Sequence, residues 1–129
     1  MEGVDLRNQD LRNVSFFRAR LSGADLDYAN LAGCDLDKAN LSGANLFEAD
    51  LSRADMKSGD LSEVFLKGVD LSEANLLRAN INGASLENAC LKRVELGWAD
   101  LTKASLTYEQ VEEPRSLQVA TMPDGTIHE

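Results

Sequence analysis

Every fifth residue between Leu6 and Leu106 is apolar, in one uninterrupted series of twenty-one positions. Eighteen of these positions are leucine, and the other three are Phe16, Met56 and Ile81. On a continuous α-helix, a step of five residues would rotate successive members by about 140°, and on a straight strand they would alternate between opposite faces. The chain must therefore bend once per repeat, so that it coils and keeps the same positions inside. This pattern predicts a solenoid.

Two further positions of the five-residue unit are nearly as regular. The residue two before each core position is usually alanine, as in Ala19, Ala24, Ala29 and Ala39. Residues two apart on a short extended segment point to the same side, so we expect a small and a large side chain inside together. The residue directly before the core position is Asp or Asn in fourteen of the twenty-one repeats. Such side chains bond to nearby backbone and tolerate turns, which gives them a structural role.

Units such as Ala24-Asp25-Leu26-Asp27-Tyr28 and Ala39-Asn40-Leu41-Ser42-Gly43 resemble the A-(D/N)-L-x-x unit of the pentapeptide-repeat proteins. The resemblance implies an all-β solenoid, a right-handed quadrilateral β-helix with four repeats per coil and about five coils. The resemblance also implies a protein of a bacterial type. We assign residues 1–106 to the β-helix and residues 107–129 to a C-terminal capping helix and tail.

The two ends of such a rod differ in this sequence. Thr107 and Gln110 have the spacing of a capping box, which predicts a short helix from Tyr108 that Pro114 limits. At the other end the first coil would leave its apolar side chains uncovered, and unpaired backbone at such an end recruits other chains. We therefore expect a homodimer through the N-terminal end, formed by the first apolar positions Val4, Leu6, Leu11 and Phe16.

The composition argues against catalysis and cofactors. The chain has one histidine and two cysteines, and we expect Cys34 inside the second coil and Cys90 outside the fifth, too far apart for a disulfide or a shared metal. Without a phosphate loop, a nucleophile motif or a dinucleotide fingerprint, we predict a non-enzymatic protein with no cofactor. No segment is apolar enough for a membrane and no targeting segment is evident, so we expect a soluble, cytoplasmic chain.

The net charge of −9 raises the alternative of a DNA mimic that binds DNA gyrase or topoisomerase, as some pentapeptide-repeat proteins do. With four repeats per coil the outward residues fall on four faces, named here by their core series: face 1 from Leu6, face 2 from Leu11, face 3 from Phe16 and face 4 from Leu21. Face 1 has five acids and two bases, faces 2 and 3 each have four of both, and face 4 has three acids and two bases. Residues 107–129 add five acids and one base. Two neutral faces do not resemble the regular negative charges of the DNA phosphates. The chain has no basic stripe, so the sequence does not indicate direct nucleic-acid binding.

Outward aromatic side chains are the least expected feature of such a rod. Tyr28, Phe47 and Phe65 fall on face 1 in consecutive coils, and Leu77 and Trp98 are neighbours on face 3. Local packing between adjacent coils is the preferred explanation for such residues, but exposed apolar clusters can also mark interaction sites. Our hypothesis is a rigid protein-protein interaction scaffold, in which these residues, Phe47 and Phe65 above all, contact a protein partner whose identity the sequence does not give.

Overall fold

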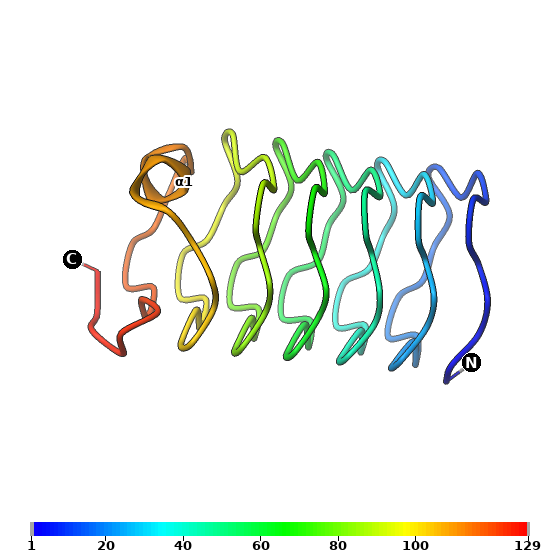
Figure 1. Ribbon diagram of the computed structural model, residues 1–129, viewed down its shortest axis with the longest axis horizontal. Helices are drawn as coiled ribbons and strands as arrows, with labels where there is room; N and C mark the ends of the chain where they lie inside the picture. Colours follow the sequence, from blue (N-terminus) through cyan, green and yellow to red (C-terminus); the bar gives the residue numbers. More distant parts are fainter. Residues whose placement is uncertain (1, 129) are drawn as a thin grey trace.

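The computed structural model describes residues 2–128 and shows a rod of stacked coils that advances from the N-terminus to the C-terminus (Figure 1). Parallel β-bridges join the residues before the core positions to their counterparts twenty residues later, from Asp5 with Asp25 to Ser85 with Ser105. Twenty residues are four repeats, so the expected number of repeats per coil is confirmed. The strands are isolated bridges of single residues, and the one helix in the described residues is α1, Tyr108–Glu112.

The backbone hydrogen bonds explain why the five-residue unit has its composition. In the repeat 44–48, the amide of Ala44 closes a turn onto Leu41 O at 2.9 Å. The amide of Asn45 donates to the preceding coil, and those of Leu46 and Glu48 donate to the following coil. The amide of Phe47 is the fifth, and it donates to Asn45 Oδ1 at 3.1 Å. Every amide of the repeat thus has a partner, and the Asp or Asn before the core leucine supplies one of them.

The second residue after each core position from Leu6 to Leu101 has a left-handed backbone whether or not it is glycine. Gly43 has φ 65°, and Tyr28, Arg53 and Trp98 have φ between 57° and 60°. This conformation is unfavourable for residues that carry a Cβ atom, by roughly 1–2 kcal/mol. The turn requires it at every corner, so the strain belongs to the architecture and is not a mark of a binding site.

The core is a continuous stack of aliphatic side chains. From Leu21 to Leu101 the residues of the leucine series are exposed by 2% or less. In the first coil Leu6, Leu11 and Phe16 are only half-buried, because no described coil lies beyond them. Cys34 is buried and free, and its thiol donates to Leu11 O at 2.9 Å, while Cys90 is half-buried and also free, as expected from the faces.

The C-terminal end is covered by a helix and a short antiparallel segment. Thr107 caps α1, and both bonds of the predicted capping box with Gln110 are present. The ladder continues past residue 106, since Ser116 and Thr121 bridge to Glu95 and Asp100, and Thr121 then pairs with Ile127 in the antiparallel sense. The last coil is therefore incomplete, with α1 in the place of one of its sides.

Candidate interaction surface on the solenoid faces

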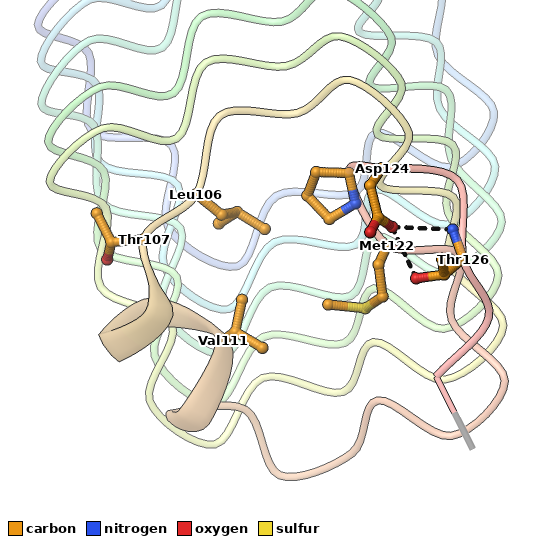
Figure 2. A pocket seen from close by; sticks show the side chains of 7 residues that line it. Leu106, Thr107, Val111, Met122, Asp124 and Thr126 are labelled. Carbon is orange, nitrogen blue, oxygen red and sulfur yellow. Dashed lines mark hydrogen bonds between the residues drawn. The ribbon is translucent and has the colours of Figure 1, made fainter.

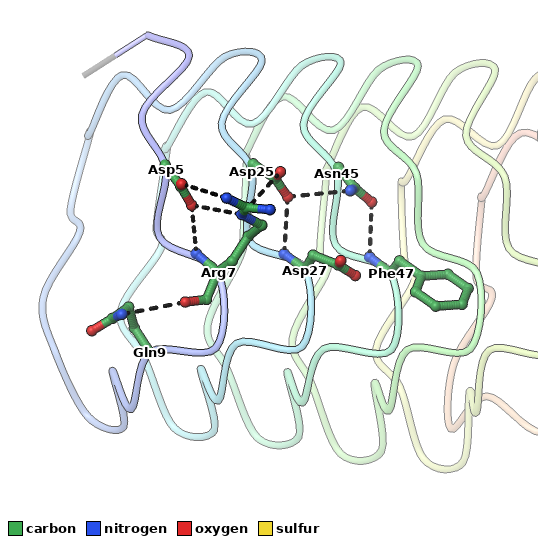
Figure 3. Close-up of polar contacts among 7 residues, drawn as sticks. All are labelled: Asp5, Arg7, Gln9, Asp25, Asp27, Asn45 and Phe47. Carbon is green, nitrogen blue, oxygen red and sulfur yellow. Dashed lines mark hydrogen bonds and ion pairs between the residues drawn. The ribbon is translucent and has the colours of Figure 1, made fainter.

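The residue directly after each core position points outward, and where an Asp or Asn precedes the core residue its side chain accepts a hydrogen bond from the amide of that outward residue. On face 1 this row runs through Arg7, Asp27, Phe47, Lys67 and Glu87, one residue in each coil. Figure 3 shows the first three members of the row, Arg7, Asp27 and Phe47, in consecutive coils. The row therefore presents an aromatic ring between an acidic and a basic residue.

Two of the predicted patch residues form a direct contact. The rings of Tyr28 and Phe47 lie edge to face, with their centroids 5.6 Å apart and their planes at 89°. Tyr28 is 55% exposed, whereas Phe47 is half-buried. The amide of Tyr28 donates to Phe47 O at 2.9 Å, so the backbone holds the two rings in adjacent coils. This is the only pair of aromatic rings in contact among the side chains that the structure describes.

The other three predicted residues are outward but less closely associated. Phe65 is 48% exposed on face 1, and its ring does not stack on Phe47 within the described part of the chain. On face 3, Trp98 is 57% exposed, and the half-buried Leu77 lies over Gly97, with Cδ1 3.1 Å from the place a Cβ atom would take. We therefore narrow the face 1 cluster to the pair Tyr28 and Phe47, with Phe65 as its neighbour in the next coil.

Charged side chains border this pair on the N-terminal side. Arg7 lies between Asp5 and Asp25, with Nη2 2.8 Å from Asp5 Oδ2 and Nε 3.6 Å from Asp25 Oδ2 (Figure 3). Its hydrogen bonds to Asp5 lower the pKa of that carboxyl to about 2. Asp25 Oδ1 also accepts from the amide of Asp27 at 3.3 Å and from Asn45 Nδ2 at 3.2 Å. The carboxylates of Asp5 and Asp25 thus already have ion-pair and hydrogen-bond partners within the chain.

Asp27 is different from these neighbours. Its Oδ1 is buried and accepts no hydrogen bond from residues 2–128, and it takes part in none of the ion pairs that the structure describes. A buried acceptor without a donor is unfavourable, and a positive charge near this carboxylate would stabilise it. Asp37 occupies the same place on face 3, but Lys57 Nζ lies 3.7 Å from its Oδ2.

Phe17 is an exposed aromatic residue that the sequence reasoning missed. It is 49% exposed on face 3, and the guanidinium carbon of Arg18 lies 5.2 Å from the centre of its ring. The rule that identified Phe47 also places Phe17 outward, since both directly follow a core residue. The protein thus already contains one cation placed on an aromatic ring.

A hollow of about 340 Å³ lies at the C-terminal end, between the last turn and α1 (Figure 2). Its apolar lining comes from the half-buried Leu106, Val111 and Met122. On its rim Asp124 accepts hydrogen bonds from the amide and the hydroxyl of Thr126. Leu106 and Met122 pack against the core, and the incomplete last coil leaves them partly open.

No group of three or more His, Cys, Asp or Glu residues with the geometry of a metal site occurs between residues 2 and 128. The same residues contain no helix with the length and hydrophobicity needed to cross a membrane. Burial raises the pKa of the Cys34 thiol, the opposite of what an activated nucleophile requires.

The comparisons define the class of protein that this fold and surface represent. The family model for pentapeptide repeats matches eight copies, over residues 1–27, 15–53, 24–68, 49–88 and 79–108. The chain therefore belongs to the pentapeptide-repeat family. Comparison with curated protein sequences finds no significant match.

Solved structures of the same family are similar to this chain. One is a pentapeptide repeat protein of the Arabidopsis thaliana thylakoid lumen, 30% identical over 84% of this chain and 72% of that one, with a TM-score of 0.54. HetL of the cyanobacterium Nostoc sp. strain PCC 7120, a protein involved in the regulation of heterocyst differentiation, is 25% identical over 98% of this chain and 92% of its own, with a TM-score of 0.56. The fluoroquinolone resistance protein QnrB1 shares the fold at 16% identity, with a TM-score of 0.52 over 82% of this chain and 72% of its own.

Proposed function

We propose that this chain is a non-enzymatic scaffold that binds a protein partner through face 1, with Tyr28 and Phe47 as the centre of the contact. The observation that carries this proposal is the edge-to-face ring pair, which is held on the outside of a regular solenoid and is largely exposed at Tyr28. Aromatic side chains dominate the energetics of protein interfaces because they bury much area with little loss of side-chain freedom.

Packing between coils, through the ring of Phe47, accounts for only part of the Tyr28 side chain. A ring that only filled a gap between coils would be buried, whereas more than half of the Tyr28 side chain faces solvent. Its left-handed backbone, with φ 57°, would be more stable with glycine at this corner. The exposure of the ring, and not the backbone conformation, supports a role in binding.

Tyr28→Gly is the sharpest test of this proposal. The substitution removes the exposed ring and relieves the left-handed strain, so we expect unchanged or slightly raised thermal stability. In affinity capture from a lysate of the native cell, with bound proteins identified by mass spectrometry, we expect the captured partner to be reduced by tenfold or more.

Lys38→Gly is the matched control. Lys38 lies at the equivalent corner of face 3 in the same coil and has φ 58°, so the substitution relieves the same strain without removing a ring. We expect this variant to capture the partner as well as the wild type does. Equal capture by Tyr28→Gly and wild type would refute a role for face 1.

The alternative function, a DNA mimic that binds gyrase, has weaker support. Face 1 is the acidic face, but its negative charge is interrupted by the Arg7 ion pairs and by the aromatic cluster, and faces 2 and 3 are neutral. A mimic needs a continuous negative surface. Inhibition of DNA supercoiling by gyrase at stoichiometric amounts of this protein would favour the mimic over the scaffold.

We also propose that two copies of this 129-residue chain associate through the first coil. Leu6, Leu11 and Phe16 are half-buried there, and the described chain offers no backbone partner to the amides of Asp5 and Asp10. Paired coils would satisfy such amides. Analytical ultracentrifugation at micromolar concentration should give a dimer, and Leu11→Lys should shift it to the monomer. A monomeric wild type would contradict this proposal.

A further inference from the structure

We propose that the Tyr28–Phe47 pair and Asp27 together form a seat for an arginine side chain in a basic segment of the protein partner. This inference rests on the scaffold function proposed above and specifies the chemistry of the partner. Three properties of the surface support it: open aromatic faces, a carboxylate without a partner, and a local excess of negative charge.

The geometry of the ring pair leaves aromatic faces available. In an edge-to-face pair at 89°, one ring abuts only one face of the other, so the remaining faces stay free of that contact. The negative face of such a ring attracts a guanidinium group placed within about 6 Å of its centre. Among residues 2–128, no lysine or arginine occupies this place over Tyr28 or Phe47.

Asp27 supplies the anion for such a cation. It immediately precedes Tyr28 and lies between Arg7 and Phe47 in the outward row of face 1 (Figure 3). The buried Oδ1 of Asp27 has no donor within the described chain, while Arg7 is already committed to Asp5 and Asp25. A guanidinium group over the rings would compensate the charge of this carboxylate by direct or through-space attraction.

The charge of the whole face favours a basic partner over an acidic or neutral one. Face 1 carries the five acids Asp5, Asp25, Asp27, Glu48 and Glu87 against the two bases Arg7 and Lys67. Faces 2 and 3 are neutral and face 4 has three acids against two bases, so among the four faces face 1 attracts a basic partner most strongly. Electrostatic complementarity of this kind orients a partner and speeds its association.

The same chemistry occurs within the protein. On face 3 the guanidinium of Arg18 lies 5.2 Å from the centre of the exposed Phe17 ring. On face 1 the ring pair has its carboxylate but no cation from the described residues. An arginine from another protein would complete on face 1 the arrangement that Arg18 makes on face 3.

The inference is tested with a blocked peptide, acetyl-Gly-Arg-Gly-Arg-Gly-amide, titrated into the full chain at about 150 mM salt to screen diffuse attraction. Binding is followed through the aromatic NMR signals of Tyr28 and Phe47. We expect saturable shifts of these signals, and no shifts with the same peptide carrying the neutral isostere citrulline in place of arginine. Asp27→Asn and Tyr28→Gly should each weaken binding about three- to fivefold.

Asp37→Asn is the matched control, because Asp37 has the same place in the same coil on face 3 and also has a buried Oδ1 without a donor. It removes the same charge and should leave peptide binding unchanged. Equal weakening by Asp27→Asn and Asp37→Asn, equal binding of the citrulline peptide, or no binding would each overturn the inference. If Tyr28→Gly abolishes partner capture while the arginine peptide does not bind, the scaffold proposal stands and only the arginine seat is rejected.

Discussion

Leu51→Ala is expected to destabilise the protein by about 3–5 kcal/mol, a large part of the stability of a domain of this size. Leu51 is fully buried in the third coil, between Leu31 and Leu71 of the same face. The substitution leaves a cavity that the neighbouring coils cannot close, because the hydrogen bonds between coils fix their spacing. Urea denaturation followed by circular dichroism measures the loss as a lower transition midpoint.

Leu11→Ala provides the control, since Leu11 is the first member of the same face and only half-buried. In the single chain the side chain loses less contact with the core, and we expect a loss of about 1–2 kcal/mol when unfolding is measured at a concentration too low for two copies to associate. In a solenoid the stability of each coil depends on its two neighbours, and the first described coil is covered on one side. Equal losses for Leu11→Ala and Leu51→Ala would mean that the burial of the core leucines is not the source of stability.

The sequence was sufficient to predict which residues are inside and which are outside, because each position of the repeat has the same orientation in every coil. The sequence also predicted the structural role of the Asp or Asn before the core leucine, because the hydrogen bond from the backbone to its side chain lies within one turn. Both depend on residues close together in the chain. The capping box of Thr107 and Gln110 was predictable for the same reason, and it is present.

Contacts between coils were harder to predict. Tyr28, Phe47 and Phe65 form one diagonal in sequence, and only side-chain conformation brings Phe47 against Tyr28 while leaving Phe65 apart. Coil closure also imposes a left-handed backbone on bulky residues such as Trp98, against their intrinsic preference. The five-residue pattern did not reveal the incomplete sixth coil. Its core residues, such as Leu117, follow their counterparts in the previous coil by twenty-one residues instead of twenty.

Gln110→Glu is expected to destabilise the C-terminal end by about 4 kcal/mol at neutral pH. The buried amide group of Gln110 donates from Nε2 to Leu86 O at 2.6 Å and to Ala89 O at 3.0 Å, and its Oε1 accepts from the amide of Thr107 at 2.9 Å. Glutamate keeps the oxygen that accepts from Thr107 but places a negative oxygen against two carbonyl oxygens. One side chain thus joins the helix cap to the last complete coil.

The pH dependence separates this cause from a simple loss of packing. The carboxyl introduced by Gln110→Glu would face two carbonyls and have a pKa raised in the folded state, because only its protonated form can donate to them. The penalty relative to wild type should therefore grow as pH rises from the unfolded-state pKa towards the folded-state pKa, and should shrink below about pH 4. Gln110→Ala, which removes both bonds without adding a charge, should lose about 3 kcal/mol at every pH. Thermal unfolding at about pH 4 and about pH 8 measures both differences, and a Gln110→Glu penalty independent of pH would contradict the role assigned to the Nε2 bonds.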